Sequence, residues 1–432
     1  MNARPKGTAA IICIGDELLI GQVVNTNAAS MAEKLNGAGI LVRETITVGD
    51  DQAQILHAFR NMCGQYAITL VTGGLGPTHD DITRGALLKF FGTQLAVHEP
   101  TLAHIRSIVQ ARNIPWTPAA EDQAMVPRGC TVIPNKHGTA PGMMFQRDDA
   151  ILVAMPGVPY EMESMMDDFV VPFLKEKFPG QVVRHRTLKT TGIPESFLAA
   201  KLGNIDELLA GAKLAFLPTP GGVRMRITAM GNDSATVDQK VREIEQRIRQ
   251  KAEKYIYGFD GDELEEAVGK LLTERKLTIA VAESCTGGLI ADRITNVPGS
   301  SNYFERGVVT YSDKSKAEIL GVPETLLVQS GAVSKEVAEA MAVGVRTAAK
   351  TDIGISTTGI AGPTGGSAEK PVGLVWIGYS DKNETIALRF NFGEPAGASG
   401  ARLRFKQRAS QAALELVRRR LSKIETQLQG QY

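Results

Sequence analysis

Short apolar runs that end in polar or glycine-rich loops recur along the first third of the chain. Three of them cover residues 8–14, 68–71 and 150–154. Runs of this length bounded by turn residues are typical of buried strands. Residues 25–38 and 83–91 carry apolar side chains at helical spacing and predict two helices, the first with Asn27 as its cap. Strands that alternate with helices predict an α/β domain with a mostly parallel sheet.

The pattern of apolar positions changes after Pro172. Residues 184–191 alternate like a half-exposed strand, and residues 214–230 predict a hairpin around a turn rich in proline and glycine. Residues 233–254 predict an amphipathic helix. These elements together indicate a small α+β domain.

Strands and helices alternate again from about Gly261. A buried strand is predicted at 277–282, followed by a polar loop and a helix at 289–295. Further strands are predicted near residues 307–311, 353–357, 373–379 and 385–392, before a final helix at 401–421. The sequence therefore predicts three domains: an α/β domain over 1–172, an α+β domain over 173–258 and a second α/β domain over 259–425.

Composition and charge exclude several classes of protein. The 432 residues carry 48 Lys and Arg against 47 Asp and Glu, a formal net charge of +1, which argues against a dedicated nucleic-acid binder. Four scattered cysteines without CxxC spacing indicate neither a zinc site nor a disulfide framework. The apolar run at the N-terminus is too short for a signal peptide, and no stretch approaches the length of a membrane span. We expect a cytoplasmic protein without a membrane partner.

The loop after residues 68–71 has the composition of a phosphate-binding turn. Thr72-Gly73-Gly74-Leu75-Gly76 lets the backbone approach a diphosphate ahead of a helix. Asp80 and Asp81 follow it, and two carboxylates beside a phosphate site favour Mg²⁺ or another hard divalent ion. Another strand-end loop, after residues 8–14, carries Asp16, Glu17, Asn25 and Asn27, which could converge on the same place. The alternative is an ordinary glycine turn with an aspartate as helix cap.

A second loop with candidate chemistry is Glu283-Ser284-Cys285-Thr286-Gly287-Gly288. It lies between a predicted strand and a helix, where a hydroxyl is held beside backbone N–H groups that can face an oxyanion. A serine nucleophile needs a base, and no histidine lies after His185. The bases left open are a lysine, a tyrosine or a carboxylate, with Tyr311, Lys314 and Lys316 just after an apolar strand. Cys285 is a rival nucleophile, and an N-cap role for Ser284 is the structural alternative.

Several motifs resemble the CinA family along nearly the whole chain. They are GDELLIGQVVNTN, TGGLGPTHDDITR, NKHGTAPGM and MPGVPYEM in the first domain, and AVAESCTGGLIADRIT, GVVTYSDKSKAEILGV and STTGIAGPTGG in the last. The middle domain is similar to the family's KH-type linker domain. It lacks an obvious GxxG clamp with flanking basic residues, so we infer no RNA binding.

For the first domain, the resemblance implies a three-layer α/β sandwich similar to the molybdopterin-binding (MoaB/MogA-like) fold. It also implies a pyrophosphatase that acts on ADP-ribose or a related dinucleotide with a divalent metal, Mg²⁺, Mn²⁺ or Co²⁺. The residues carried over are Asn27, Gly73, Gly74 and Thr139 for the nucleotide and Asp16, Asp80 and Asp81 for the metal. The resemblance further implies a homodimer.

For the last domain, the resemblance implies a nicotinamide-nucleotide amidohydrolase, which converts nicotinamide mononucleotide (NMN) to nicotinate mononucleotide and ammonia without a cofactor. The family pattern Tyr-Ser-x-x-x-Lys falls on Tyr311 and Lys316, which favours Lys316 over Lys314 as the base for Ser284, with Tyr311 helping proton transfer or orientation. Thr358 would hold the substrate amide or phosphate and help stabilise the oxyanion. The implied substrate-binding residues are Gly287, Gly288, Gly359, Arg402 and Arg404.

One stretch departs from the family pattern. Members usually carry a GDR-like motif and a second arginine before the last helix, whereas residues 392–406 here read FGEPAGASGARLRFK. Arg402 or Arg404 could take the phosphate-binding place, with Lys406 near the second position, or this basic run could be a solvated helix face. A non-catalytic nucleotide- or pterin-binding regulator is the alternative function.

Overall fold

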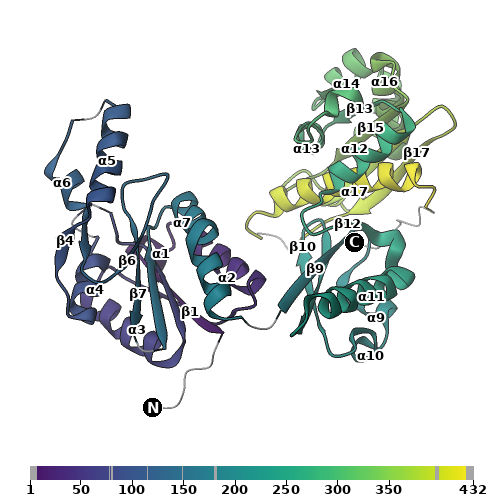
Figure 1. Cartoon of the computed structure of the whole chain (residues 1–432). Coiled ribbons are helices and arrows are strands. Elements are labelled where there is room, and N and C mark those ends of the chain that lie inside the picture. The colour runs from purple at the N-terminus through teal and green to yellow at the C-terminus, as the bar shows by residue number, and fades with distance from the viewer. Residues whose placement is uncertain are drawn as a thin grey trace. The chain divides into compact units, whose positions relative to one another are not determined.

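The structure of the chain is a computed structural model that describes residues 7–76, 78, 81–113, 115–147, 149–179, 182–394 and 398–424. It divides into two compact units, one of residues 1–184 with 230–238 and one of residues 185–229 with 239–432. Figure 1 shows the elements of both units. No helix in the described part of the chain is long and apolar enough to cross a membrane.

The first unit is built on a six-stranded sheet with the order β2-β1-β3-β8-β7-β6. The four strands from β2 to β8 run parallel, and β7 pairs antiparallel with both β8 and β6, so the expected mostly parallel sheet is confirmed. Their bounds are β1 Thr8–Ile14, β2 Leu41–Val48, β3 Ile68–Thr72, β6 Thr131–Ile133, β7 Gly142–Arg147 and β8 Ala150–Met155.

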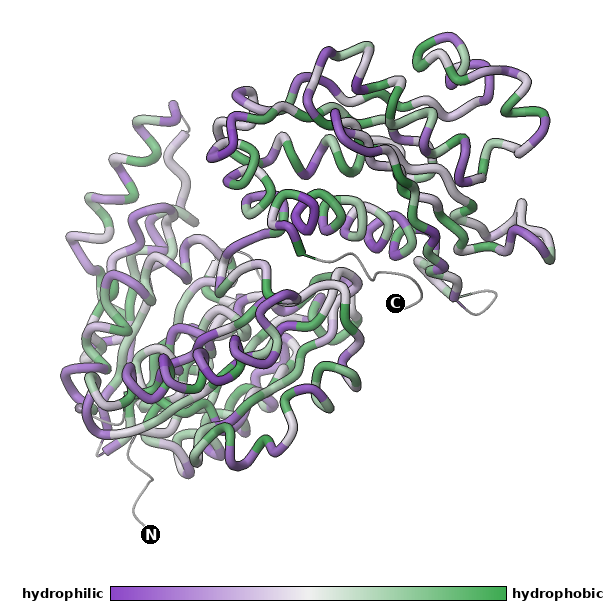
Figure 2. The backbone as a smooth tube through the Cα atoms, turned by 90° about the vertical axis from the view of Figure 1, so that its right-hand side faces the viewer, coloured by the Kyte–Doolittle hydropathy of each residue, from purple (hydrophilic) through white to green (hydrophobic). Residues whose placement is uncertain are grey.

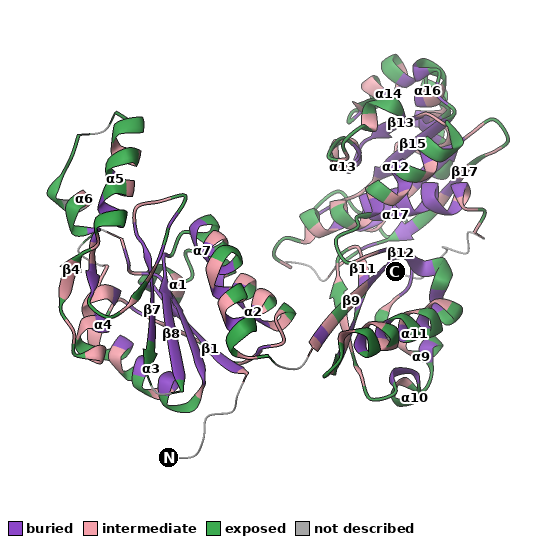
Figure 3. Ribbon diagram, in the orientation of Figure 1, coloured by how far each residue is buried: buried purple, intermediate pink, exposed green. Residues whose placement is uncertain are grey.

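Alternate residues of β1 face two separate cores. Ala9, Ile11 and Cys13 pack with α2 and α7, whereas Ala10, Ile12 and Ile14 pack with α3 and α4. Because successive side chains of a strand point to opposite faces, a sheet covered by helices on both sides has apolar residues at every position. Figure 3 accordingly shows β1 and β8 buried along their length. The domain is therefore a three-layer α/β sandwich, as predicted.

The other elements of this unit fill the two outer layers and a small appendage. The helices are α1 Asp16–Leu19, α2 Thr26–Gly37, α3 Gln52–Gln65, α4 Thr83–Phe91, α5 Glu99–Ala111, α6 Pro118–Asp122, α7 Pro159–Met165, a π-helix Met166–Val170 and α8 Val171–Lys177. The short strands β4 Leu95–Val97 and β5 Met125–Pro127 pair with each other. The sequence motifs contained no sign of this β4–β5 pair.

A smaller sheet of four strands, in the order β10-β11-β9-β12, lies mainly in the second unit. Its strands are β9 Val182–Thr190, β10 Lys213–Thr219, β11 Gly222–Gly231 and β12 Ile256–Phe259. The helices are α9 Glu195–Leu202, α10 Ile205–Leu209, α11 Ser234–Ala252 and a 3₁₀ turn Glu253–Tyr255. This is the expected α+β domain, with the predicted hairpin formed by β10 and β11.

The second unit also contains a five-stranded sheet in the order β14-β13-β15-β16-β17. Strands β13 Ile279–Glu283, β14 Phe304–Val309 and β15 Ile353–Gly359 are parallel, and β16 Leu374–Ser380 and β17 Thr385–Asn391 continue the sheet antiparallel. The helices are α12 Leu264–Arg275, α13 Leu289–Thr295, a 3₁₀ turn Ser300–Asn302, α14 Asp313–Leu320, α15 Glu324–Ser330, α16 Lys335–Ala349 and α17 Ala401–Leu421.

Helices cover both faces of this sheet too. Ile279 and Val281 of β13 pack with α12, α13 and α17, while Ala280 and Ala282 pack with α14 and α16. Figure 2 shows helices in which hydrophilic and hydrophobic stretches alternate, as expected when one face packs on a sheet. The parallel strands β13, β14 and β15 end at the same edge, and loops at that edge of such sheets position ligands.

Candidate functional site

Ser284 lies immediately after β13, in the turn that leads to α13. Its backbone N–H donates to the carbonyl oxygen of Thr357 on the neighbouring strand (3.0 Å), and its own carbonyl accepts from Gly287 N–H (3.2 Å). Gly287 and Gly288 have φ values of 60° and 93°, which a residue with a Cβ atom rarely adopts. The two glycines therefore allow the tight turn that holds Ser284 at the end of the strand. This backbone requirement explains both of them without a bound ligand.

The carboxylate of Glu283 caps α13 from the preceding strand. This side chain is 1% exposed and accepts from the N–H groups of Gly288 (2.9 Å), Ile290 (3.1 Å) and Ala291 (2.9 Å). A carboxylate is favourable at this end of a helix, where unpaired N–H groups carry partial positive charge. Those three N–H groups are consequently not free to bind a substrate anion.

Two backbone N–H groups of the same turn remain open. Those of Cys285 and Thr286 donate to no oxygen atom in the described part of the chain. They directly follow Ser284, where donors of an oxyanion hole are commonly found. The turn thus combines a fixed hydroxyl with two uncommitted donors.

Lys316 is brought to Ser284 by α14 and is 1% exposed. Its Nζ lies 3.5 Å from Ser284 Oγ, 3.2 Å from the carbonyl oxygen of Thr310 and 3.3 Å from that of Tyr311. The Asp313 carboxylate is 3.9 Å away. Lys314, the rival candidate, is exposed and lies near Glu318 (3.6 Å), so the structure joins Lys316 and not Lys314 to the serine.

Burial has opposite consequences for the two ionisable neighbours of Ser284. Desolvation lowers the pKa of Lys316, although the nearby Asp313 carboxylate raises it in part. Desolvation raises the pKa of the Cys285 thiol to about 12. A lysine with a lowered pKa can act as a base, whereas a thiol that does not ionise is a poor nucleophile. The geometry therefore favours Ser284 over Cys285.

Tyr311 and Arg402 are joined by a hydrogen bond between their side chains. Tyr311 is 61% exposed, and its hydroxyl accepts from Arg402 Nη2 (2.9 Å), while Arg402 Nη1 donates to the carbonyl oxygen of Gly362 (2.7 Å). It is the backbone carbonyl of Tyr311 that contacts Lys316. The tyrosine hydroxyl is therefore bonded to the arginine and has no direct contact with the lysine.

The two other basic candidates differ in what they contact. Arg404 Nε donates to both carboxylate oxygens of Glu394 (2.8 and 3.0 Å), so its charge is already paired. Lys406, on the same helix α17, has no hydrogen-bond or ion-pair partner in the described part of the chain. A carbon atom added at Gly287 would lie 3.4 Å from Lys406 Nζ. Among the described residues, Lys406 is thus a cation beside the Ser284 turn without a partner, whereas Arg404 is already paired.

Thr358 and Gly359 occupy the end of β15. The Thr358 hydroxyl donates to the carbonyl oxygen of Ala332 (2.7 Å), so its hydrogen is not available to an oxyanion. This corrects the expected role of Thr358 as an oxyanion donor. Gly359 lies so close to β16 that an added carbon atom would be 2.6 Å from the carbonyl oxygen of Leu374. The close approach of the backbone explains this glycine without a ligand.

The first domain contains a cavity of about 440 Å³ at the carboxyl ends of β1, β3 and β8. Asn27, Gly73, Gly74 and Thr139 all line it, together with Asp81. Gly73 and Gly74 have φ values of 106° and 65°. Side chains there would also overlap the Ile14 carbonyl oxygen and the Thr83 hydroxyl, so the backbone turn requires glycine at both positions.

Asn27 is not the cap of α2. Asn25 is, because its side-chain oxygen accepts from Ala28 N–H (3.0 Å). Asn27 lies inside the helix, and its amide nitrogen donates to Thr72 Oγ1 (3.0 Å) and to the Gly157 carbonyl oxygen (2.8 Å). Asparagine suits both a helix cap and a buried amide that bridges two segments. Only the fold shows which of these roles an asparagine has.

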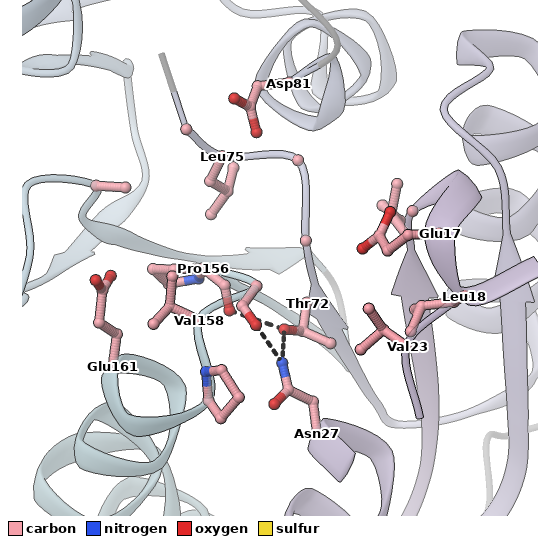
Figure 4. Close-up of a pocket in the computed structure, with 18 of the residues that line it drawn as sticks. Glu17, Leu18, Val23, Asn27, Thr72, Leu75, Asp81, Pro156, Val158 and Glu161 are labelled. Carbon is pink, nitrogen blue, oxygen red and sulfur yellow. Dashed lines mark hydrogen bonds between the residues drawn. The ribbon is translucent and has the colours of Figure 1, made fainter. Parts of the chain in front are cut away.

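The acidic residues around this cavity are not all those predicted. Asp16 is paired with Asp50, whose backbone N–H donates to it (3.1 Å), and Asp16 is absent from the cavity wall. The predicted Asp81 does line the cavity, together with Glu17, Asp50 and Glu161. Figure 4 shows Glu17, Asp81 and Glu161 on different sides of it. Glu161 and Asp50 were missed, although Glu161 stands in the motif MPGVPYEM.

The described carboxylates do not by themselves form a metal site. No three His, Cys, Asp or Glu side chains within the described ranges are close enough to hold one ion. One oxygen of Asp81 is already bonded to Thr78, whose backbone N–H donates to it (2.8 Å). Asp80, the third predicted ligand, lies outside the described residues. Carboxylate oxygens suit a hard divalent ion, but those described here are too far apart to bind one alone.

Comparisons with known proteins agree with this arrangement of domains. Family models match in the order "Probable molybdopterin binding domain" (residues 10–176), "Damage-inducible protein CinA KH domain" (185–258) and "CinA C-terminal domain" (261–421). The CinA-like protein of Chloroherpeton thalassium is 43% identical over 419 residues, 96% of this chain and 99% of that protein. The CinA-like protein of Flavobacterium psychrophilum is 40% identical over 418 residues, 96% of this chain and 99% of that protein.

A crystal structure of the competence/damage inducible protein CihA from Agrobacterium tumefaciens is 37% identical, with a TM-score of 0.34. The match covers 36% of this chain and 91% of that chain. The resemblance seen in the sequence motifs is confirmed by the three family models and by relatives that match from end to end. The chain belongs to the CinA family.

Proposed function

We propose that the C-terminal domain hydrolyses the carboxamide of NMN to nicotinate mononucleotide and ammonia, with Ser284 as nucleophile and Lys316 as base. The observation that carries this proposal is the 3.5 Å contact between Lys316 Nζ and Ser284 Oγ at a buried position. The pairing of a serine with a lysine base is known from unrelated folds. The absence of histidine after His185 leaves no imidazole in the sequence of this domain.

Acylation would begin with neutral Lys316. Ser284 Oγ attacks the carboxamide carbon while its proton passes to Nζ of Lys316. The resulting ammonium carries three N–H groups, and two of them can donate hydrogen bonds to the carbonyl oxygens of Thr310 and Tyr311. Lys316 then gives the third proton to the leaving nitrogen. The C–N bond breaks, ammonia leaves, and an ester to Ser284 remains.

The negative charge on the attacked carbonyl oxygen needs donors. The N–H groups of Cys285 and Thr286 are the uncommitted donors of this turn, while Glu283 occupies those further along. Loss of an oxyanion donor in other enzymes costs about 10²–10³-fold in rate. A water molecule then attacks the acyl carbon and gives a proton to neutral Lys316. Lys316 passes this proton to Oγ of Ser284 as the ester bond breaks, so nicotinate mononucleotide is released and the serine hydroxyl is restored.

The substrate phosphate would bind the free cation of Lys406. Arg404 is unsuited because Glu394 neutralises it, and Arg402 is held by Tyr311 and Gly362. A phosphate next to an unpaired lysine forms a charge-assisted hydrogen bond. This places the phosphate beside Gly287, on the turn that carries the nucleophile.

Ammonia release from NMN by the purified chain tests this proposal directly. The wild-type chain should form nicotinate mononucleotide and ammonia in equal amounts with or without EDTA, because the mechanism uses no metal. A wild-type chain that binds NMN without turnover would contradict the proposal and favour a non-catalytic regulator.

We further propose that the cavity of the first domain binds a dinucleotide such as ADP-ribose and supports hydrolysis of its diphosphate. Gly73 and Gly74 shape a turn whose following N–H groups, those of Gly74, Leu75 and Gly76, donate to no oxygen in the described residues. Consecutive free N–H groups form an anion-binding concavity. Because the described carboxylates are insufficient, a divalent ion (Mg²⁺, Mn²⁺ or Co²⁺) would have to gain ligands from the diphosphate.

Product analysis with ADP-ribose tests this second activity. AMP and ribose 5-phosphate should form with added Mg²⁺, Mn²⁺ or Co²⁺, and EDTA should abolish the reaction while leaving NMN hydrolysis intact. ADP-ribose that binds tightly and is never cleaved would contradict the pyrophosphatase proposal and support a binding function.

A further inference from the structure

Arg293 lies on α13, the helix that follows the Ser284 turn, and its guanidinium contacts two other helices. Nε and Nη2 donate to the Glu265 carboxylate on α12 (3.2 and 2.7 Å). Nη1 donates to the Ser410 hydroxyl oxygen (3.0 Å) and Nη2 to the Gln411 side-chain oxygen (2.8 Å), both on α17. One side chain thus ties together α12, α13 and α17, which Figure 1 labels. The mechanism proposed above uses none of these four residues.

The four residues form a fixed contact in the interior of the domain. Ser410 is fully buried and Gln411 is nearly so, while the side chains of Arg293 and Glu265 are 16% and 12% exposed. The Ser410 hydroxyl donates to the carbonyl oxygen of Gln407 (3.0 Å), which leaves its oxygen to accept from Arg293. Charge-assisted hydrogen bonds shielded from water are stronger than those of an exposed ion pair.

The contact on α17 lies one helical turn from Lys406. Ser410 follows Lys406 by four positions on this helix, and residues four apart lie on the same side of a helix. The Nζ atom of Lys406 is 3.4 Å from the place of a carbon atom added at Gly287, in the turn that leads into α13. Arg293 therefore joins α13 and α17 close to the point where the lysine approaches the nucleophile turn.

The apolar side chains of α17 around Ser410 fix the helix less sharply than these hydrogen bonds do. They are the buried Ala409, Ala412 and Ala413, and hydrophobic contact is not directional, whereas hydrogen bonds are. The Ser284 turn has anchors of its own in the Thr357 carbonyl oxygen and the Glu283 cap. Loss of the Arg293 contacts should consequently displace Lys406 and leave the nucleophile turn in place.

We propose that Arg293 is a positioning residue, which holds Lys406 at a fixed distance from Ser284. The cation then meets the substrate phosphate when the carboxamide reaches the nucleophile. This inference rests on the proposed hydrolysis of NMN and on the proposed phosphate contact of Lys406. Because the ribose joins the two ends of the substrate, a displaced Lys406 weakens the phosphate contact and leaves the chemistry at the carboxamide unchanged. Arg293 thus helps the site to select a nicotinamide nucleotide over the unphosphorylated nucleoside.

Steady-state ammonia release from NMN and from nicotinamide riboside, which lacks the phosphate, tests the inference. Arg293→Lys keeps a charge for Glu265, but its single nitrogen cannot hold three partners at once. The double variant Ser410→Ala/Gln411→Ala instead removes the acceptors on α17 and keeps the Arg293–Glu265 pair. Both should raise KM for NMN by up to about tenfold, the effect expected for loss of the Lys406 contact, with kcat retained. KM for nicotinamide riboside should stay unchanged.

Two further variants separate this role from a merely structural one. Lys406→Ala added to Arg293→Lys should raise KM for NMN no further than Lys406→Ala alone, because both changes remove the same contact. Lys270→Ala, on α12, removes an exposed cation near Glu274 (4.0 Å) outside the Arg293 contacts and should leave both KM values unchanged. KM does not depend on the fraction of folded enzyme, so partial misfolding does not imitate the expected result.

The possible failures of this experiment are distinguishable. An equal rise in KM for both substrates, or an unchanged KM for NMN in the Arg293→Lys chain and the double variant, would overturn the inference alone. A Lys406→Ala chain with an unchanged KM for NMN would contradict the phosphate contact. A wild-type chain that releases no ammonia from NMN would contradict the proposed function itself. In the last two cases the inference fails as well.

Discussion

Lys316 Nζ and Ser284 Oγ lie 3.5 Å apart, and both side chains are buried although they come from segments 32 residues apart in the sequence. Strand β13 and the start of α14 bring them to one edge of the sheet. Two backbone carbonyls hold the lysine in place. In the proposed mechanism this contact would provide Ser284 with a base, in a domain whose sequence contains no histidine.

Replacement of Lys316 should separate charge from basicity. Lys316→Met removes the base and should lower kcat for NMN by about 10²–10⁴-fold, the usual contribution of a general base. Lys316→Arg restores a positive charge but not a group that can lose its proton at neutral pH, so it should not rescue kcat. Steady-state ammonia release measures both, and an active Lys316→Arg variant would rule out the lysine base.

The pH profile should report the protonation of Lys316. The base is active when neutral, so kcat/KM rises with pH through the pKa of Lys316, which burial lowers from the ordinary 10.5 of lysine. The Asp313 carboxylate opposes this by favouring the ammonium form. Asp313→Asn should therefore lower the pKa further and move the rising limb to lower pH. A shift to higher pH would contradict the assignment.

Glu283 should be required for the shape of the nucleophile turn. Glu283→Ala leaves the N–H groups of Gly288, Ile290 and Ala291 without their acceptor, and the loss at the buried Ile290 alone costs about 1–3 kcal/mol. We expect a lower midpoint of thermal unfolding and a lower kcat. Glu283→Gln keeps one acceptor oxygen and should lose less of both, and equal stability of Glu283→Ala and the wild type would contradict the cap.

Lys406 and Arg404 offer a matched test of phosphate binding. Lys406→Ala removes the free cation beside Gly287 and should raise KM for NMN by about tenfold or more, since a hydrogen bond to a charged group is worth about 1.5–3 kcal/mol. Arg404→Ala breaks a pair with Glu394 and should leave KM nearly unchanged. The opposite result would assign the phosphate to Arg404.

Much of the fold could be predicted from the pattern of apolar residues. The helices at 83–91, 289–295 and 401–421 begin and end where the sequence predicts, because glycines and polar loops flank each of them. The β4–β5 pair could not be seen, since its three-residue strands are too short for a periodic signal. Short elements of this kind depend on tertiary packing. The 13-residue helix α5 was also missed, although Leu102 and Ile105 lie on its buried face.

The parts of each candidate site that lie on a single loop could be predicted from the sequence. The Ser284 turn and the glycines of residues 73–76 are contiguous in sequence, and the structure places both at strand ends. Contacts between distant segments could not be predicted, such as the bridge from Asn27 to Gly157 or the Glu394 pair that occupies Arg404. Residue type alone also could not show which carboxylates line the cavity. Glu161 does, whereas Asp16 accepts a hydrogen bond from the backbone N–H of Asp50 and does not.

The most direct test of the central claim compares ammonia release from NMN by the wild-type chain, Ser284→Ala and Cys285→Ala. The wild type should release ammonia, and Cys285→Ala should retain this activity because the pKa of its thiol is raised to about 12 by burial. Ser284→Ala should release none. Activity that survives in Ser284→Ala, or disappears in Cys285→Ala while the protein stays folded, would contradict a Ser284–Lys316 mechanism.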